Sequence, residues 1–478
     1  MNPTLDLLQE LIRRPSITPD DAGCQALIAA RLHAAGFTIR HLRLGDTDNL
    51  WATHGSGAPL ITFAGHTDVV PPGDLAAWTS PPFAPTIRDG KLYGRGAADM
   101  KAGVAAMTVA LERLAATPHP GTLALLLTSD EEGDGTHGSK AVLAQLAQEG
   151  VHIDYSIVGE PSTAARLGDR ARHGRRGSLH LHLTLHGKQG HVAYPANVRN
   201  PIHALGAVIA RLAATRWDDG NAHFPPTSFQ VSNLAAGTGA ENVVPATASC
   251  KANWRYNTEH DAASLQAQAT ALIEETLQNS GIRAEYQWKL SGEPFLTENA
   301  ALIAALRAAV ATHTGETLQL DTGGGTSDAR FLAKYGAATV EFGPDSATLH
   351  QIDEHVPVAD LAQHPGQGGA PVLDPGQALR VGVEGVQVLP QLGGDIGRVD
   401  GQPPHAPGQG GQDRVDVVDG GQGALGRGDK GQDVRGLRDH GLLVAGQGRP
   451  GRRGGAAQVL GALEPGRLGG QARVLAGT

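Results

Sequence analysis

Seven acidic or imidazole side chains stand at or near the ends of short apolar segments or beside a helical one: His66, Asp68, Asp99, Glu131, Glu132, Glu160 and His350. The segments "LITFAG", "LALLLTSD" and "YSIVG" are typical of buried strands, and polar groups follow each of them at once. In open α/β sheets, ligands bind beyond the carboxyl ends of the strands. The placement therefore predicts a functional site at one edge of a sheet.

A metal centre is the chemistry that such a set favours. Zinc takes imidazole and carboxylate ligands, and two zinc ions roughly 3.5 to 4 Å apart need a carboxylate that bridges them. One His and one acid for each ion, with Asp99 shared, come from His66, Asp99, Glu132, Glu160 and His350. Adjacent residues at a strand end point in different directions, so Glu131 is free to be the general base.

Each of these residues has a simpler interpretation when it is considered without the others. Two adjacent glutamates in a loop are usually a solvated surface pair, and a single histidine such as His350 is more often a loop residue than a ligand. Asp68, two residues after His66, also fits the carboxylate that orients a metal-binding histidine. The joint placement at strand ends favours the metal site.

The elements that must position these residues follow two patterns. Up to about residue 176, short apolar strands alternate with helical segments, which predicts an α/β fold with a mostly parallel sheet. From Ser178, apolar residues alternate with polar ones, as in a half-exposed antiparallel strand. We therefore expect a catalytic domain in two parts, 1–177 and 292–364, with an α+β domain inserted at 178–291.

The C-terminal segment 365–478 has a different composition. It holds 31 of the chain's 65 glycines and no Phe, Tyr or Trp. Such a segment buries too little apolar surface to offset its ordering entropy, so we expect it to be disordered.

Composition limits the partners and the compartment. A formal net charge of -9 and a pI near 6.1 give no basic surface for nucleic acid or anionic lipid, which favours a small-molecule substrate. Cys24 and Cys250 are the only cysteines, so neither a disulfide framework nor a cysteine-rich zinc site is expected. The N-terminus has the pattern of an amphipathic helix capped near Thr4, and no run reaches the roughly 18 apolar residues of a membrane span. We expect a soluble, cytoplasmic protein.

Long motifs resemble a known family. The segments "GHTDVVPPGDLAAWTSPPFAPTIRDGKLYGRGAADMKAG", "TSDEEGDGTHGSK" and "VGEPS" closely resemble the dizinc amidohydrolases, the family of aminoacylases, acetylornithine deacetylase and related exopeptidases. Further similarity lies in "RHGRRGSLHLHLTLHGKQGHVAYP", "AGTGAENVVP", "NWRYN" and "DTGGGTSDARF". The resemblance covers residues 1 to about 363.

The resemblance implies a role for each predicted site residue. It places His66 and Glu160 on a first zinc, Glu132 and His350 on a second, and Asp99 between them, with cobalt able to substitute. It also makes Asp68 the residue that orients His66 and Glu131 the general base. The implied reaction is metal-assisted hydrolysis of an amide in an acylated amino acid that carries several carboxylates.

The resemblance further implies a homodimer formed through the inserted domain, in which His191 reaches the partner subunit's site to stabilise the oxyanion. The residues that match substrate-binding positions are Arg175, Ser178, Asn242, Arg255 and Thr326. Arginine suits this role because its planar fork binds a carboxylate through two hydrogen bonds. A solvated basic loop is the alternative for any single arginine of the cluster Arg170, Arg172, Arg175 and Arg176.

Other functions remain open on the sequence alone. A deacetylase or an aminoacylase would use the same metals and base, and only the carboxylate-binding residues distinguish them. A catalytically silent relative, used as a dimeric binding module, would lack Glu131 or one ligand.

The tail departs from the family, whose members continue after "VPVADL" with an amphipathic helix. We hypothesise a frameshift near His364, with a genuine disordered extension as the alternative.

Overall fold

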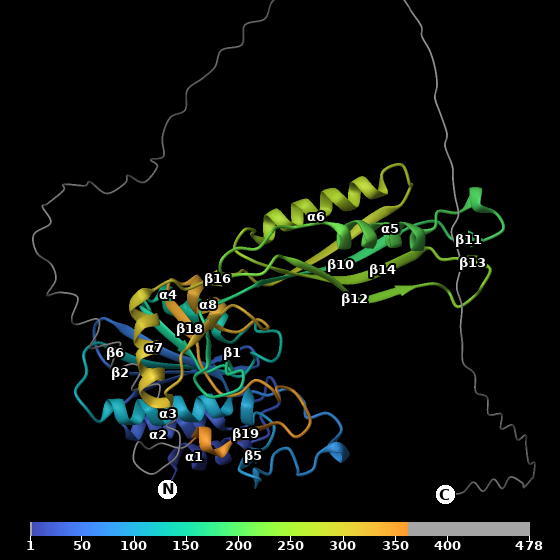
Figure 1. Ribbon diagram of the computed structural model, residues 1–478. Helices are drawn as coiled ribbons and strands as arrows, with labels where there is room; N and C mark the ends of the chain where they lie inside the picture. Colours follow the sequence, from blue (N-terminus) through green and yellow to red (C-terminus); the bar gives the residue numbers. More distant parts are fainter. Residues whose placement is uncertain (1, 362–478) are drawn as a thin grey trace, which may run out of the picture. The chain divides into compact units, whose positions relative to one another are not determined.

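The computed structural model describes residues 2–361 of the chain (Figure 1). The segment 365–478, for which we predicted disorder, lies outside the described residues, as do the last residues of the predicted segment 292–364.

The first sheet has eight strands in the order β1-β2-β6-β3-β7-β18-β8-β17. Their bounds are β1 (Thr38–Leu44), β2 (Thr47–Gly55), β3 (Leu60–His66), β6 (Thr122–Thr128), β7 (Tyr155–Val158), β8 (Arg170–Arg172), β17 (Gln319–Asp321) and β18 (Ala338–Glu341). The central strands β6, β3, β7 and β18 are parallel, whereas β1 and β2 form an antiparallel hairpin and β2 pairs antiparallel with β6. The predicted α/β class is confirmed, and the sheet is mixed because a two-residue turn such as that between β1 and β2 joins only antiparallel strands.

Helices cover both faces of this sheet (Figure 1). The helices are α1 (Pro3–Ile12), α2 (Cys24–Ala34), α3 (Ala102–Ala115), α4 (Ser139–Gln148), α7 (Ala300–Thr314) and α8 (Ala329–Lys334). One hydrophobic cluster joins α1, α2, α3 and α7 to one face, and another joins α4 and α8 to the other. Strand β6 supplies Leu125 and Leu127 to the first cluster and Leu126 to the second, so its sequence is apolar throughout.

The cap of α1 differs from the prediction. The side chain of Asn2 accepts a hydrogen bond from the backbone N–H of Leu5 at 3.1 Å, and Pro3 begins the helix. Thr4 lies inside the first turn, because proline is well suited to the first helical position and moves the cap one residue before it.

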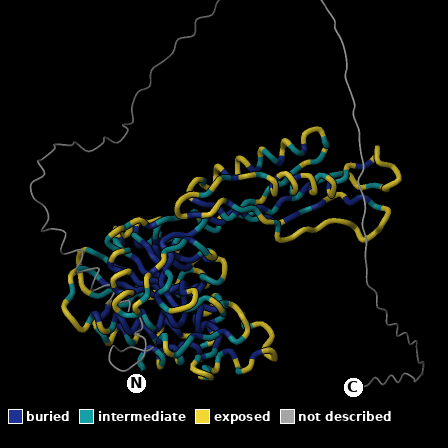
Figure 2. The backbone as a smooth tube through the Cα atoms, in the orientation of Figure 1, coloured by how far each residue is buried: buried dark blue, intermediate teal, exposed yellow. Residues whose placement is uncertain are grey.

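A second sheet lies within the predicted insertion. It is antiparallel, in the order β12-β14-β10-β15, with helices α5 (Pro201–Ala214) and α6 (Ala262–Leu277). Its strands are β10 (Gly177–His186), β12 (Ser228–Ala236), β14 (Thr247–Tyr256) and β15 (Arg283–Gly292). A separate hydrophobic cluster includes Leu179, Leu181, Leu183 and Leu185, the residues whose alternation predicted the strand. Burial is dense around the first sheet, whereas most of β12 is exposed (Figure 2).

The remaining elements are short. They are β4 (Thr86–Arg88), β5 (Lys91–Tyr93), β9 (Gly174–Arg175), β11 (Gly190–His191), β13 (Val243–Val244), β16 (Phe295–Leu296), β19 (His355–Pro357), η1 (Leu75–Ala77), η2 (Ala97–Lys101), η3 (Pro195–Asn197) and η4 (Val358–Leu361). Among the described residues, none of the helices has the length and apolar character required to cross a bilayer.

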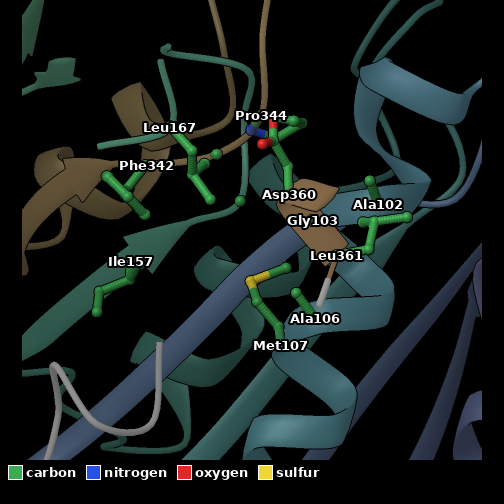
Figure 3. Close-up of a pocket in the computed structure, with 12 residues that line it drawn as sticks. Ala102, Gly103, Ala106, Met107, Ile157, Leu167, Phe342, Pro344, Asp360 and Leu361 are labelled. Carbon is green, nitrogen blue, oxygen red and sulfur yellow. The ribbon is translucent and has the colours of Figure 1, made fainter. Parts of the chain in front are cut away.

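An apolar pocket lies beside α3, and none of the predicted site residues lines it. Ala106, Met107, Leu167 and Phe342 line it, together with Leu361 at the end of the described chain (Figure 3). Because its walls offer few polar groups, it is not the place where the predicted chemistry would occur.

Candidate metal centre

The predicted acids and histidines meet because three neighbouring strands end at the same edge. His66 is the last residue of β3, Glu132 follows β6, and Glu160 follows β7. Strand β3 lies between β6 and β7 and is parallel to both. The carboxyl ends of these strands therefore bring the three side chains to one place.

Two groups of side chains offer ligand atoms, and Asp99 belongs to both. One group is His66, Asp99 and Glu160, and the other is Asp99, Glu132 and His350, with all ligand atoms of a group within 4.8 Å of one another. In the first group, His66 Nε2 lies 3.3 Å from Asp99 Oδ1 and 3.6 Å from Glu160 Oε1. In the second, His350 Nε2 lies 3.2 Å from Asp99 Oδ2 and 3.0 Å from Glu132 Oε1. The two oxygens of Asp99 thus face different histidines, as a bridging carboxylate requires.

The residues of this cluster fit a bound cation. His66 Nε2 and Asp99 Oδ1 are buried and have no hydrogen-bond partner. Buried polar atoms in proteins are nearly always paired, so a bound cation would give these two atoms the partner that the protein does not supply. Imidazole nitrogens and carboxylate oxygens are the donors that zinc accepts.

The charges of the cluster shift the pKa values of its members. Hydrogen bonds to Asp99 and Glu132 raise the pKa of His350 to about 10. Burial, together with the charge of Asp99, raises the pKa of Glu160 to about 8. Burial alone would lower the pKa of His66, but the neighbouring carboxylates of Asp68 and Asp99 raise it well above its usual range. The cluster therefore holds protons that a metal ion would displace.

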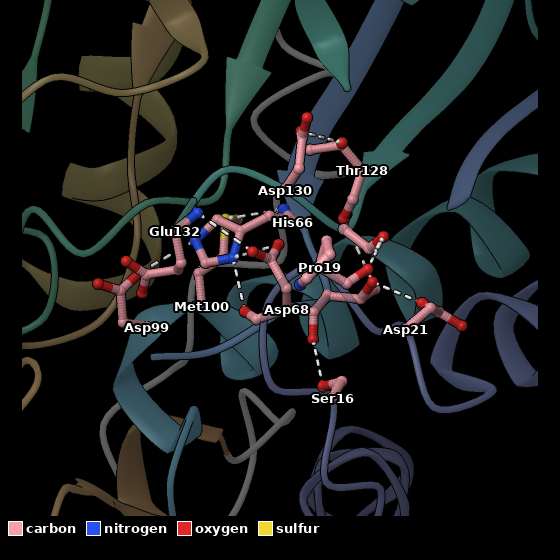
Figure 4. A network of polar contacts seen from close by, with 12 residues as sticks. Ser16, Pro19, Asp21, His66, Asp68, Asp99, Met100, Thr128, Asp130 and Glu132 are labelled. Atoms are coloured by element: carbon pink, nitrogen blue, oxygen red, sulfur yellow. Dashed lines mark hydrogen bonds and ion pairs between the residues drawn. The ribbon is translucent and has the colours of Figure 1, made fainter. Parts of the chain in front are cut away.

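Asp68 connects the two groups. Its backbone carbonyl oxygen lies 2.8 Å from His66 Nδ1, and its carboxylate Oδ1 lies 3.5 Å from the same nitrogen (Figure 4). Its Oδ2 accepts a hydrogen bond of 3.1 Å from the backbone N–H of Glu132. The residue therefore orients the imidazole of one group and the backbone of the other.

A hydrogen-bond network behind Asp68 fixes the ends of the strands. Thr67 donates from Oγ1 to Asp21 Oδ1 at 2.6 Å, and its carbonyl oxygen accepts from Ser16 Oγ at 2.6 Å. The backbone N–H of Thr67 donates to the carbonyl of Thr128 at the end of β6. These contacts join the N-terminal segment to β3 and β6, and no local pattern in the sequence indicates them.

Glu131 lies beside the ligands without belonging to either group. Burial raises the pKa of its carboxyl group well above the usual range, and the charge of His66 opposes that shift. A carboxylate of raised pKa next to a metal centre can accept a proton from water and return it later.

Arg175, one of the two arginines predicted to bind substrate, has a protein partner for each nitrogen of its guanidinium group. The guanidinium of Arg175 forms a buried ion pair with Glu341, and its Nη1 donates to the carbonyl oxygens of Gly323 and Gly325, both at 3.1 Å. Ser327 Oγ also donates to Glu341. In this structure Arg175 and Glu341 hold the glycine-rich loop in which Thr326 lies.

Other guanidinium groups have unused donors. Arg176 Nε, Arg255 Nη1 and Arg330 Nε are buried and have no hydrogen-bond partner. Asn253 Nδ2 donates to Ser178 Oγ at 3.0 Å, on the strand β10 next to Arg255 on β14. Unpaired buried donors of this kind suit an anionic ligand. Sequence reasoning did not assign a role to Arg176 or Arg330.

His191 and Asn242 are neighbours in a different part of the chain. His191 lies on β11, which pairs with β13, and the backbone carbonyl of Asn242 accepts from Val192 N at 3.1 Å. The imidazole of His191 is exposed, and its Nδ1 accepts from the backbone N–H of Ala193. The structure thus places these two predicted residues together on the ribbon β11–β13.

Comparison with known proteins gives relatives along most of the chain. A sequence model of the peptidase family M20/M25/M40 matches residues 62–364. The succinyl-diaminopimelate desuccinylase of Stenotrophomonas maltophilia is 56% identical over 368 residues, which is 77% of this chain and 97% of the relative. The enzyme of the same name from Xanthomonas oryzae pv. oryzae is 55% identical over 367 residues, or 76% of this chain and 96% of the relative.

Solved structures share the fold at low sequence identity. An aminopeptidase PepT from Bacillus cereus has a TM-score of 0.65 at 21% identity and covers 80% of this chain and 98% of its own. A dinuclear metal-binding peptidase of the M20 family from Bacillus subtilis has a TM-score of 0.56 at 15% identity, covering 81% and 97%.

The α/β fold, the cluster and these relatives define the class: the chain is a metal-dependent hydrolase. More particularly, it belongs to peptidase family M20/M25/M40.

Proposed function

We propose that the chain hydrolyses the amide of N-succinyl-LL-2,6-diaminopimelate to succinate and LL-2,6-diaminopimelate, a step in the synthesis of diaminopimelate and lysine. The observation that carries this proposal is that two groups of potential metal ligands share Asp99 and that Glu131 lies beside them. The desuccinylases to which the chain is similar support the choice of substrate. A cytoplasmic location is what we expect for such a step.

Two zinc ions, with cobalt able to substitute, would be held in the two groups. His66 and Glu160 would hold one, Glu132 and His350 the other, with Asp99 shared. When bound, such ions polarise a carbonyl and lower the pKa of water. The surrounding side chains of the protein transfer the protons and orient the substrate.

Proton transfer is assigned to Glu131. Its carboxylate would accept the proton of the attacking water and return it to the leaving amine, which is general base and then general acid catalysis by one group. Asp68 would keep His66 oriented throughout through its contacts with Nδ1.

Stabilisation of the oxyanion is assigned to His191 of a second subunit. In its own chain, His191 is the exposed residue of strand β11, and its imidazole packs against the ring of Tyr194. We propose a homodimer formed through the inserted region 178–291, in which the ribbon β11–β13 reaches the partner's site. A donor aimed at the developing oxyanion contributes strongly to such reactions.

Substrate binding is assigned to Arg175, Ser178, Asn242, Arg255 and Thr326, with Arg176 and Arg330 added from the structure. The proposed substrate carries three carboxylates. The unpaired donors of Arg176, Arg255 and Arg330 would form hydrogen bonds with them. The contacts of Arg175 with Glu341 give it a second role, because they hold the loop of Thr326.

The reaction itself can be tested directly. The full-length protein, stripped of metal and reloaded with zinc, should release equal amounts of succinate and LL-2,6-diaminopimelate, measured by chromatography. A chelator should abolish the release and added zinc should restore it. Release that continues in metal-free protein would refute the metal-dependent mechanism.

Replacing Arg255 with Ala should raise KM and lower kcat/KM by about 10- to 100-fold, because a hydrogen bond to a charged group contributes roughly 1.5–3 kcal/mol. Steady-state kinetics at fixed zinc concentration provide the measurement. Arg211→Ala is the matched control, since Arg211 forms an exposed pair with Glu275 on helix α6. Equal kinetics for both variants would remove Arg255 from the substrate site.

Metal binding should weaken as the pH falls. The pKa of His350 is raised to about 10 and that of Glu160 to about 8, so both carry protons near neutral pH and must lose them to bind a cation. Affinity should fall about tenfold per released proton for each unit of pH. Calorimetric titration with zinc in two buffers of different ionisation enthalpy measures this release, and a binding enthalpy independent of buffer would contradict it.

A further inference from the structure

A buried ion pair lies beside the metal centre and supplies none of its ligand atoms. Arg95 Nη1 and Glu354 Oε2 are 2.6 Å apart, and their side chains are only 2% and 1% exposed. Arg95 precedes η2, which contains Asp99, and Glu354 precedes β19, a few residues after His350. The pair therefore joins the two loops that carry these ligands.

The carboxylate of Glu354 holds the loop of Asp99. It accepts backbone N–H groups from Gly96 at 3.1 Å, Ala98 at 2.8 Å and Asp99 at 3.0 Å. Asp99 has non-helical dihedral angles, φ -117 and ψ 102, so the regular helical pattern of hydrogen bonds is interrupted there. Glu354 supplies acceptors in its place and fixes the backbone from which the Asp99 side chain extends.

The guanidinium of Arg95 holds the loop of His350. Its Nη1 donates to the carbonyl oxygen of Gln351 at 3.1 Å, and its Nη2 donates to that of His350 at 3.4 Å. The group also lies over the ring of Trp78, 5.2 Å from the centroid. One buried pair thus bonds to the backbone of Asp99 on one side and to that of His350 on the other.

We propose that Arg95 and Glu354, called here the clasp, are positioning residues for the ligand group Asp99, Glu132 and His350. The inference rests on the proposed two-metal function. His350 belongs only to this group, whereas His66 and Glu160 of the other group are placed by the ends of β3 and β7. Arg95 bonds to the loop of His350, so replacing Arg95 should weaken binding at this group more than at the other. Glu354 bonds to the loop of Asp99, which both groups share, so replacing Glu354 should weaken binding at both.

Two variants test the clasp in the full-length protein. Glu354→Gln keeps the size of the side chain but removes its charge. Arg95→Lys keeps the charge beside Glu354 but cannot reach both carbonyl oxygens of the His350 loop. Glu112→Gln is the matched control, because it breaks another Arg–Glu pair, with Arg31 at 2.7 Å, between helices away from the centre.

The measurement is stepwise binding of cobalt to metal-free protein, from zero to two equivalents, followed by visible absorption and by competition with a chelator. We expect Arg95→Lys to bind one equivalent like the parent and the other about 10- to 100-fold more weakly, as when outer contacts of metal ligands are removed. Glu354→Gln should weaken both equivalents, because it loosens the loop of the shared residue Asp99. The control should match the parent in both steps. Circular dichroism establishes that each variant is folded, and Arg95→Lys decides if Glu354→Gln does not fold.

Two results would overturn the proposal in distinguishable ways. If the parent binds two equivalents and folded Arg95→Lys binds both as tightly as the parent, or binds both equally weakly, the clasp does not position the group of His350. If the parent itself binds only one equivalent, the two-metal function fails and the clasp proposal fails with it. Neither result depends on whether the substrate has been identified correctly.

Discussion

Replacing Glu131 with Gln is expected to lower kcat by about 10²- to 10⁴-fold, the usual contribution of a positioned general base. The protein should still bind two metal ions, because Glu131 belongs to neither ligand group. Glutamine has nearly the same shape but cannot accept the proton of water and pass it to the amine. The substitution therefore separates the chemical step from metal binding.

Kinetics and metal content must be measured on the same preparation. Glu10→Gln, which changes an exposed glutamate on α1, is the matched control and should leave both unchanged. Hydrolysis by Glu131→Gln at the parental rate would show that another group removes the proton. Loss of metal together with activity would instead make Glu131 a ligand.

The second large effect concerns the proposed dimer. His191→Ala alone should lower kcat by about 10²- to 10³-fold, as when one oxyanion donor is removed. Mixed dimers of a His191→Ala subunit and a Glu131→Gln subunit should regain about half of the parental activity, because in a twofold dimer one of the two sites then has both residues intact. Restoration by mixing two inactive proteins is a result that a monomer cannot produce.

Mixed dimers can be isolated with two different affinity tags and assayed beside each pure variant. If mixed dimers are as inactive as their parents, His191 does not act across a subunit interface. Sedimentation at the assay concentration provides the independent check, since a monomeric parent would refute the dimer itself.

The sequence predicts that the ligand side chains meet because three of them come just after predicted strands. His66, Glu132 and Glu160 each follow a short apolar strand, and parallel strands that are neighbours must end at one edge. Asp99 and His350 are harder to place, because Asp99 lies in the distorted helical turn η2 and His350 in a loop, and the course of both depends on distant contacts. In the structure, Asp99 belongs to both groups and His350 to one of them. This is the arrangement that we inferred by counting one His and one acid for each ion.

The residues that the sequence did not reveal make their contacts over long separations. Glu354 follows Asp353 just before the short strand β19, and Glu341 is the last residue of β18. Nothing near either glutamate indicates that it pairs with Arg95 or Arg175. Arg330 lies on a helix, where arginine is a common residue, and only its buried, unpaired Nε marks it. Local patterns predict elements well, but buried ion pairs depend on the tertiary fold.

The most direct test of the central claim compares kcat/KM for N-succinyl-LL-2,6-diaminopimelate and for N-acetylornithine with zinc-loaded, full-length protein. We expect a preference of at least about 10³-fold for the succinyl substrate, because each unmatched carboxylate leaves buried guanidinium donors unpaired. Equal values, or a preference for the acetyl substrate, would contradict the proposed substrate and indicate another amidohydrolase activity of the same family.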